Sequence, residues 1–354
     1  MTISGQALFF DRDVLYRLNA FFGHTMIPFS VLDLSRVIQG ATVTDALHDT
    51  LALAQQAERF HYHRIWFAEH HNMVGVASAA TSVVVGYVAG GTQKIRVGSG
   101  GVMLPNHSPL VIAEQFGTLA SLYPGRIDVG LGRAPGTDML TARALRRDPG
   151  MNAEHFPQDV MELQSYFDVP KPGQAVRAFP GMGTKVPVWL LGSSTFSAQL
   201  AAQLGLPFAF AAHFAPDDME QALYAYHNQF APSKQLDKPY AMVCLNVLAA
   251  DTEEEAWHQF SSHQQVFVSM RRGTPGPIPP PVPDIDQWWS PQERAMAHHM
   301  LRSSIVGSAE NVERGLREFI KMHQPSELMV TSLIYDQAAR LRSLEIVAGI
   351  RDRI

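Results

Sequence analysis

The sequence predicts an α/β protein in which eight parallel strands close into a (β/α)8 barrel, that is, a TIM barrel. Short runs that are almost entirely apolar alternate with longer runs of helical periodicity from Pro28 to the end of the 354-residue chain. Strands that are apolar on both faces are typical of parallel sheets whose two faces are covered. Eight such runs favour a closed barrel over the alternative, an open doubly wound sheet.

Hydrophobic periodicity places the strands and helices of this barrel along the chain. Thr44 or Asp45 stands where it would cap the first helix, and apolar residues then recur every three or four positions. The predicted strands are 29–34, 64–68, 95–98, 127–131, 186–191, 207–211, 240–248 and 327–333. The predicted helices are 44–60, 77–90, 110–122, 159–167, 197–204, 217–230, 253–271, 309–323 and 337–350. A helix therefore follows every predicted strand.

Two segments fall outside this repeat. We expect residues 1–27 to form an N-terminal extension, or to derive from an upstream start with Met26 as the functional one, and residues 28–354 to form the barrel. The second segment, 273–283, is too rich in proline for a helix or a central strand. It lies between the seventh and eighth strands, within a possible lid insertion at about 265–292. A surface loop and a lid over the site are both open interpretations.

Composition excludes several classes of protein. The chain has 28 Lys and Arg against 33 Asp and Glu, a net charge of −5, which argues against binding to nucleic acid or to an anionic membrane. Its single cysteine, Cys244, excludes a disulfide framework, a CxxC pair and a cysteine zinc site. Targeting signals are absent, and the long uncharged run at 72–93 fits a helix packed on a sheet better than a membrane span. We expect a cytoplasmic protein.

Glu69, His70 and His71 follow the second predicted strand, at the end of the barrel where active sites form. A carboxylate beside two imidazoles is able to act in acid–base chemistry or to bind a metal. Adjacent side chains at the end of a strand point in opposite directions, so one of the two histidines faces the barrel mouth. A loop or packing role is the alternative, and we expect no metal.

Glycines mark the ends of the third, fourth and fifth strands. Gly98, Gly100 and Gly101 indicate either a flat ligand against the backbone or a tight turn or bulge. Arg133 stands in a glycine-rich stretch at 130–136 that is a weak match to a dinucleotide-binding fingerprint. An arginine there suits a phosphate, and a structural salt bridge is the alternative.

Small residues open the helix after the fifth strand. Gly192, Ser193 and Ser194 would present hydroxyl and backbone N–H groups at a helix N-terminus, which suits an anion and equally suits ordinary capping. Arg133 comes from the neighbouring fourth strand, so the two features are able to share one phosphate. Trp288 and Trp289 beside the proline-rich segment, and Phe214 after the sixth strand, suggest an apolar ligand.

Three blocks in this order resemble the luciferase-like flavin-dependent monooxygenases, the family of bacterial luciferase (alkanal monooxygenase). The blocks are RIWFAEHH at 64–71, VGSGGVMLP at 97–105 and GRIDVGLGR at 125–133. The resemblance runs from Phe29 to Ile354 and is nearest to single-chain bacterial members of the family. It implies a (β/α)8 barrel that binds FMN.

The resemblance also implies roles for individual residues. His70 matches the active-site histidine of the family, and Gly100 and Gly101 match a pair joined by a non-proline cis peptide under the flavin ring. Arg133 matches the arginine that binds the flavin phosphate. Ser193, Ser194 and, more loosely, Ser197 match the phosphate-binding start of a helix, and the proline-rich segment lies where the family has a mobile lid.

The reaction implied by the resemblance is monooxygenation of a small organic, apolar substrate by O2. Reduced FMN would be supplied by a separate NAD(P)H:flavin reductase, and a flavin C4a-peroxide would be the oxidant. A homodimer is expected. Two alternatives stay open, namely an F420-dependent dehydrogenase on the same barrel and a flavin-binding protein without turnover.

Overall fold

The computed structural model of the chain describes residues 27–134, 139–145 and 154–354. The expected N-terminal extension therefore lies outside the described residues except for Ile27, and so does Gly136 of the glycine-rich stretch. No helix within the described ranges is long enough and apolar enough to cross a membrane.

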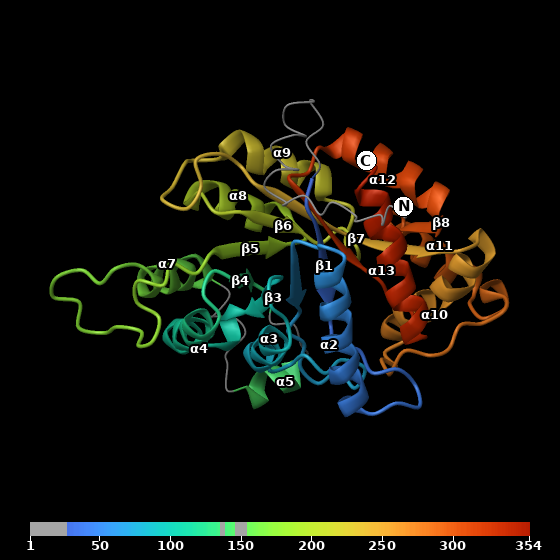
Figure 1. The fold of residues 1–354 in the computed structure, drawn as a ribbon, viewed down its shortest axis with the longest axis horizontal. Helices are drawn as coiled ribbons and strands as arrows, with labels where there is room; N and C mark the ends of the chain where they lie inside the picture. The colour runs from blue at the N-terminus through green and yellow to red at the C-terminus, as the bar shows by residue number, and fades with distance from the viewer. Residues whose placement is uncertain (1–26, 135–138, 146–153) are drawn as a thin grey trace, which may run out of the picture.

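Eight parallel strands close into a barrel, which confirms the predicted fold (Figure 1). The barrel strands are β1 (Phe29–Asp33), β2 (Arg64–Phe67), β3 (Arg96–Met103), β4 (Ile127–Gly132), β5 (Val188–Gly192), β6 (Phe208–Phe210), β7 (Ala241–Ala250) and β9 (Glu327–Thr331). Each pairs in parallel with its neighbours in this order, and β9 closes the ring by pairing with both β7 and β1. All eight predicted strands are therefore present in the barrel.

A ninth strand, β8 (Ile305–Ser308), was not predicted. It pairs in parallel with Val247–Ala250, the part of the ten-residue strand β7 that continues past its pairing with β9. Only two of its four residues are apolar, so its sequence lacks the run that marks the other strands. This segment is a strand because it pairs with the free edge of β7.

Helices cover the outside of the barrel (Figure 1). They are α2 (Val43–Arg59), α3 (Thr81–Gly90), α4 (Pro109–Leu122), α5 (Met139–Ala144), α7 (Phe156–Phe167), α8 (Thr195–Leu204), α9 (Met219–Gln229), α10 (Glu253–Arg271), α11 (Pro291–Met300), α12 (Ala309–His323) and α13 (Gln337–Arg351), with short 3-10 helices η1 (Leu104–Asn106) and η2 (Ile285–Gln287). Helices α5 and α11 were not predicted. The cap of α2 is Thr42, and Asp45 completes a capping box with it, so the predicted cap was wrong by two or three residues.

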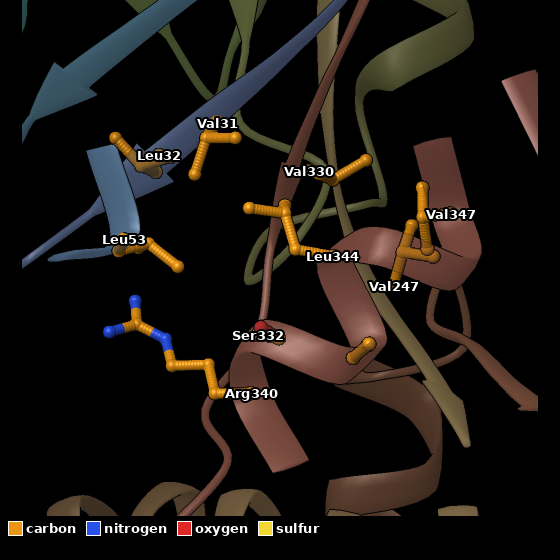
Figure 2. Close-up of a pocket in the computed structure, with 10 residues that line it drawn as sticks. Val31, Leu32, Leu53, Val247, Val330, Ser332, Arg340, Leu344 and Val347 are labelled. Atoms are coloured by element: carbon orange, nitrogen blue, oxygen red, sulfur yellow. The ribbon is translucent and has the colours of Figure 1, made fainter. Parts of the chain in front are cut away.

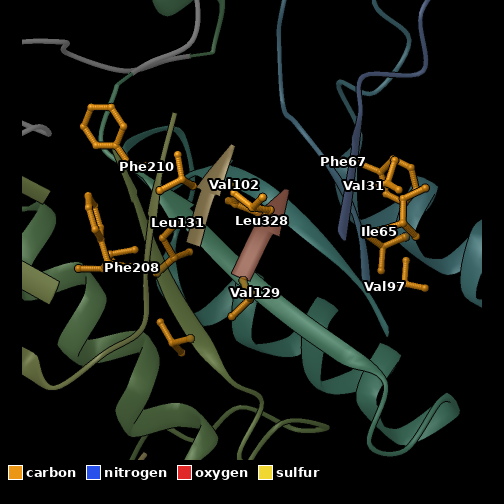
Figure 3. Packing of buried hydrophobic residues seen from close by; sticks show 14 of the residues in the cluster. Val31, Ile65, Phe67, Val97, Val102, Val129, Leu131, Phe208, Phe210 and Leu328 are labelled. Atoms are coloured by element: carbon orange, nitrogen blue, oxygen red, sulfur yellow. The ribbon is translucent and has the colours of Figure 1, made fainter. Parts of the chain in front are cut away.

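The core has two layers separated by the barrel wall. Outward-facing strand residues such as Val31, Ile65, Val97 and Val129 form the larger layer with the helices (Figure 3). Inward-facing residues, including Leu32, Trp66, Trp189, Ala209, Met242, Cys244 and Met329, fill the barrel. Side chains along a strand alternate between its two faces, and here both faces are buried in an apolar layer. The strand sequences are therefore apolar along their whole length. The barrel is thus a packed core, and only its ends are available for chemistry.

A buried ionic network closes the N-terminal end of the barrel. The Arg64 guanidinium donates from Nη1 to Asp128 Oδ2 at 2.7 Å and from Nε to Glu327 Oε1 at 2.9 Å. Tyr240 donates its hydroxyl to Glu327 Oε2 at 2.8 Å, and Arg96 binds the other side of the Asp128 carboxylate. Every charge in this layer is paired, so it supports the barrel and leaves the opposite end for ligands.

The proline-rich segment at 273–283 follows α10 and leads to η2. It is hydrogen-bonded to the loop after β1, because Ile278 N–H donates to the Val37 carbonyl at 2.9 Å and Gln39 N–H donates to the Ile278 carbonyl at 2.8 Å. The first part of the expected insertion, 265–271, belongs to α10. The segment therefore joins α10 to the carboxyl end of the barrel.

The two tryptophans beside this segment do not line the barrel mouth as expected. Trp289 is buried with Val268 and Ala297 in a small core between α10 and α11, and Trp288 packs against it. The Arg272 guanidinium lies 4.4 Å from the centre of the Trp288 ring. Packing between the helices buries Trp289 and partly buries Trp288. Of the three residues expected to contact an apolar ligand, only Phe214 therefore remains a candidate.

Candidate active site at the carboxyl ends of the strands

The predicted site residues come from four neighbouring strands and lie at one end of the barrel. His70 follows β2, Gly100 and Gly101 lie in β3, Arg133 follows β4, and Gly192 ends β5. The strands are parallel, so their carboxyl ends meet at the same rim. The parallel strands thus bring these residues to the same end of the barrel.

The Gly100–Gly101 peptide bond is cis, as the resemblance implied. The pairing register with β4 shifts between Gly100 and Val102, which is the bulge interpretation of these glycines. A Cβ atom on Gly100 would lie 2.9 Å from the Leu32 and Trp66 side chains, and one on Gly101 would lie 2.7 Å from the Gly130 carbonyl oxygen. Packing inside the barrel therefore requires these glycines, independently of any ligand.

Arg133 lies at the start of α8. Its guanidinium carbon is 4.0 Å from the centre of the Phe196 ring, the second residue of that helix. No carboxylate in the part of the chain that the structure describes pairs with Arg133. The salt-bridge interpretation of Arg133 thus finds no partner among these residues, and the expected proximity of Arg133 to the start of α8 is present.

The N-terminus of α8 has backbone donors that its cap residue does not satisfy. Ser194 is the N-cap, but its side chain makes no capping hydrogen bond, whereas Thr42, Thr252 and Ser308 cap their helices. A Cβ on Gly192 would lie 2.6 Å from Cβ of Ser197, so only glycine allows the end of β5 to approach this helix. A guanidinium beside a helix start whose N-cap side chain makes no capping hydrogen bond is an arrangement that suits a phosphate.

Glu69 is buried and organises the loops that follow β2 and β3. Its Oε1 accepts hydrogen bonds from His71 Nε2 at 2.7 Å and His107 Nε2 at 2.9 Å, and its Oε2 accepts one from the Met103 N–H at 3.1 Å. Burial raises the pKa of Glu69, but these hydrogen bonds outweigh it and lower the pKa to about 2. The hydrogen bond to Glu69 raises the pKa of His71. Sequence reasoning missed the part played by His107.

Glu69, His71 and His107 also have the composition of a metal site, with ligand atoms within 4.8 Å of one another. Each of the two imidazole nitrogens already shares a hydrogen bond with the carboxylate. These bonds hold the three side chains together at the ends of β2 and β3. We therefore assign them to the support of the site.

The low pKa of Glu69 gives a prediction for stability in acid. A carboxyl group whose pKa is lower in the folded state stabilises the protein above its ordinary pKa and loses that contribution as the pH falls through the folded value. With the pKa lowered from 4.5 to about 2, the loss between these pH values is about 3 kcal/mol. We expect the free energy of unfolding of the Glu69→Gln variant to depend less on pH there, in urea titrations. Equal slopes for both proteins would contradict the assignment.

His70 is half-buried and close enough to His213 for their charges to interact. His213 follows β6, and burial and His70 lower its pKa to about 4, although a hydrogen bond to the backbone of Cys244 opposes them. The His213 imidazole is therefore neutral at neutral pH. His71 is held by Glu69, so the two adjacent histidines have different neighbours.

Two buried polar atoms on the far side of the mouth, His213 Nδ1 and Asn246 Oδ1, have no hydrogen-bond partner in the part of the chain that the structure describes. The amide of Asn246 donates to the His213 carbonyl at 2.6 Å and to Ser304 Oγ at 3.1 Å. Asn246 interrupts the apolar run of β7, which is the signal that could have marked it in the sequence. Unsatisfied buried acceptors at a barrel mouth suit a ligand that donates hydrogen bonds.

A small cavity lies elsewhere, between β1, β9 and α13 (Figure 2). It is lined by Val31, Leu32, Leu53, Val247, Val330, Ser332, Arg340, Ser343, Leu344 and Val347. Its walls include outward-facing strand residues and helix residues, so it belongs to the packing between barrel and helices. It does not include the predicted site residues.

Comparison with known proteins adds to this geometry. A family model described as luciferase-like monooxygenase matches residues 27–323. A luciferase-like monooxygenase of Escherichia coli (strain K12) is 54% identical over 328 residues, 93% of this chain and 98% of that protein. The N-acetyl-S-alkylcysteine monooxygenase of Bacillus subtilis (strain 168) is 39% identical over 254 residues, 70% of this chain and 75% of that protein. The crystal structure of apo-MsnO8 has a TM-score of 0.86 and 33% identity, and covers 92% of this chain and 98% of that one.

Proposed function

Because the chain belongs to the luciferase-like monooxygenase family, we propose that it is an FMN-dependent monooxygenase. It would use reduced FMN and O2 to insert one oxygen atom into a small organic molecule, and a separate NAD(P)H:flavin reductase would supply the reduced flavin. A homodimer remains part of the proposal.

The observation that carries the proposal is the pairing of Arg133 with the start of α8. A guanidinium without a carboxylate partner among the described residues lies 4.0 Å from the ring of Phe196, beside a helix N-terminus that its cap does not satisfy. These residues fit the phosphate of FMN, which carries two negative charges and accepts several hydrogen bonds. Arg133, Gly192, Ser193, Ser194 and Ser197 are the proposed phosphate-binding residues.

The other residues of the rim would serve the reaction. Bound reduced FMN supplies the electrons that activate O2. The backbone of Gly100 and Gly101 would support the flavin ring, and His70 would hold or move a proton at the reacting atoms of the substrate. The proline-rich segment 273–283 would act as the lid that excludes water, and its hydrogen bonds to the loop after β1 support this role.

The name of one relative supports a proposal for the substrate class. The B. subtilis relative is named for N-acetyl-S-alkylcysteines, so we propose a thioether as the first substrate to try. Phe214 is half-exposed and packs edge-on against His213, with ring centres 4.7 Å apart. It would contribute an apolar contact at the mouth.

One experiment separates the proposed function from its alternatives. The full chain is titrated anaerobically with reduced FMN and, separately, with reduced F420, and each complex is then mixed with oxygenated buffer containing N-acetyl-S-methylcysteine. We expect FMN to bind and 18O from 18O2 to appear in the product. Tight binding of F420 with no O2 consumed would favour the dehydrogenase. Binding of FMN with no oxidation of any thioether tested would favour a flavin-binding protein.

Arg133→Met tests the phosphate site directly. A hydrogen bond to a charged group contributes about 1.5–3 kcal/mol, so we expect the Kd for FMN to rise roughly 10- to 100-fold. The Kd for riboflavin, which lacks the phosphate, should stay the same in fluorescence titrations. Arg342→Met is the matched control, because Arg342 is paired on the surface with Asp251 and Glu345. An equal loss of riboflavin and FMN affinity would place Arg133 outside the phosphate site.

A further inference from the structure

Arg36 is a buried cation at the mouth of the barrel that the proposed function does not yet use. It follows β1 by three residues and is 7% exposed. Its backbone forms a bridge with Val76, and its Nη2 donates to the carbonyl of Ser332, which follows β9. These contacts fix the guanidinium at the same end of the barrel as His70.

The remaining donors of this guanidinium are not satisfied. Arg36 Nε and Nη1 are buried and have no hydrogen-bond partner among the described residues, and the same is true of the hydroxyls of Ser35 and Ser262. Burying donors of a charged group without partners is strongly unfavourable, so such groups in a folded protein usually have a ligand or water as partner. Ser35 also has a φ of +49°, an uncommon conformation for a residue other than glycine.

Arg36 has no carboxylate paired with it alone among the described residues. Asp33 is close, but it is already bound by Arg340 Nη2 at 2.6 Å and by Thr50 Oγ1 at 2.7 Å. Burial and the neighbouring cation Arg340 lower the pKa of Arg36, while Asp33 opposes them. The surroundings of Arg36 thus disfavour a positive charge that has no further partner.

The group that faces Arg36 from α10 is a histidine and carries no negative charge. His263 of α10 is 7% exposed and close enough to interact with both Arg36 and His213. Burial and these two neighbours lower the pKa of His263 to about 3, so its imidazole is neutral at neutral pH. An anion is therefore the missing partner of Arg36 at this rim.

We propose that Arg36 binds a carboxylate on the organic substrate, so that the enzyme acts on acidic small molecules. This inference rests on the proposed function and narrows its substrate class. It requires a site separate from that of the flavin phosphate. Arg36 lies where β1 and β9 end, whereas Arg133 and α8 lie where β4 and β5 end, with β2 and β3 between them. The substrate would therefore be held by its carboxylate on one side of the mouth, near His70 and His213.

The test compares acids with their methyl esters, which lack the charge. Three pairs are titrated calorimetrically into the full chain, with and without oxidised FMN, as N-acetyl-S-methylcysteine, hexanoate and benzoate with their esters. We expect at least one acid to bind the wild type tenfold or more tightly than its ester. Arg36→Met should remove that preference, because the Kd for the acid should rise 10- to 100-fold while the Kd for the ester stays the same. Arg36→Lys should keep part of it, and Arg342→Met should keep all of it.

Several outcomes would overturn the inference. If no acid binds the wild type better than its ester, Arg36 does not bind a carboxylate, a result that does not depend on whether any variant folds. If Arg36→Met and Arg36→Lys weaken the binding of FMN instead of the binding of the acid, the Arg36 guanidinium binds the flavin. Because neither oxygen nor turnover enters these titrations, they separate this inference from the proposed function. Acid binding through Arg36 with no oxidation of any compound would uphold the site and refute the monooxygenase.

Discussion

Arg64→Met is expected to lower the free energy of unfolding by about 3–5 kcal/mol, because it leaves the buried Glu327 carboxylate without its cation. Arg64 Nη2 lies 3.1 Å from Glu327 Oε2, and its Nε lies 2.9 Å from Oε1 of the same carboxylate. Both acidic partners have fully buried side chains. Asp128 keeps Arg96, whereas Glu327 keeps only the hydroxyls of Ser30 and Tyr240 among its side-chain partners in the described residues.

Urea unfolding followed by tryptophan fluorescence would measure this loss, since Trp66 and Trp189 lie beside Arg64. Arg342→Met is again the matched control, because its partly exposed ion pairs are worth about 0–1 kcal/mol. The double variant Arg64→Met, Glu327→Gln should recover part of the stability, because it also removes the unpaired charge. A change of less than 1 kcal/mol in Arg64→Met would show that the network contributes little to the barrel.

His70→Ala is expected to lower kcat roughly 10²- to 10⁴-fold, the usual contribution of a positioned proton donor or acceptor. His70 is half-buried beside the neutral imidazole of His213, on the rim between the proposed flavin and carboxylate sites. Glu69 holds the other two histidines of this rim, His71 and His107. The Kd for FMN should therefore stay within a factor of two or so of the wild-type value.

Steady-state oxidation of the substrate identified above, with a reductase that supplies reduced FMN, would measure kcat and KM separately. The exposed histidine His48 on α2 provides the control, and His48→Ala should leave both constants unchanged. If His70→Ala lowers FMN affinity and kcat together, His70 positions the flavin. If it leaves kcat unchanged, the histidine that moves the proton has to be sought elsewhere at the rim, beginning with His213.

The mouth of the barrel thus has two proposed anion sites, with a proposed proton donor or acceptor, His70, between them. The proposed phosphate site at Arg133 uses a helix start and one guanidinium, which suits a flexible phosphorylated chain. The proposed carboxylate site at Arg36 uses a buried guanidinium fixed by Ser332, which suits a small rigid group. A substrate bound in this way would be selected by charge at one end and oxidised at the other.

The proline-rich segment and the tryptophans show how local composition misleads about function. Trp288 and Trp289 next to a possible lid suggested an apolar binding surface, yet their neighbours on α10 and α11 bury Trp289 and partly bury Trp288. Helix α11 itself was missed, although Ser290 and Glu293 form a capping box that the sequence displays. The missed strand β8 displays no such signal, because it depends on the extended edge of β7.

The sequence was enough to predict the barrel and to name the end of the barrel at which a site is expected. It could do so because a parallel strand buried on both faces is apolar along its whole length, a local property that each run shows separately. It also marked His70, Arg133 and the start of α8, because these residues follow strands directly, and position after a strand fixes position on the rim.

The three-dimensional structure was needed to show which of these residues meet and which buried polar atoms lack a hydrogen-bond partner among the described residues. Glu69 takes its partner His107 from the loop after a different strand, and Arg36 takes Ser332 from the far end of the chain. The unsatisfied nitrogens of Arg36 cannot be read from the sequence, because hydrogen-bond satisfaction depends on every neighbour in space. The fold thus follows from local patterns, whereas the choice of substrate depends on contacts between residues that are distant in the chain.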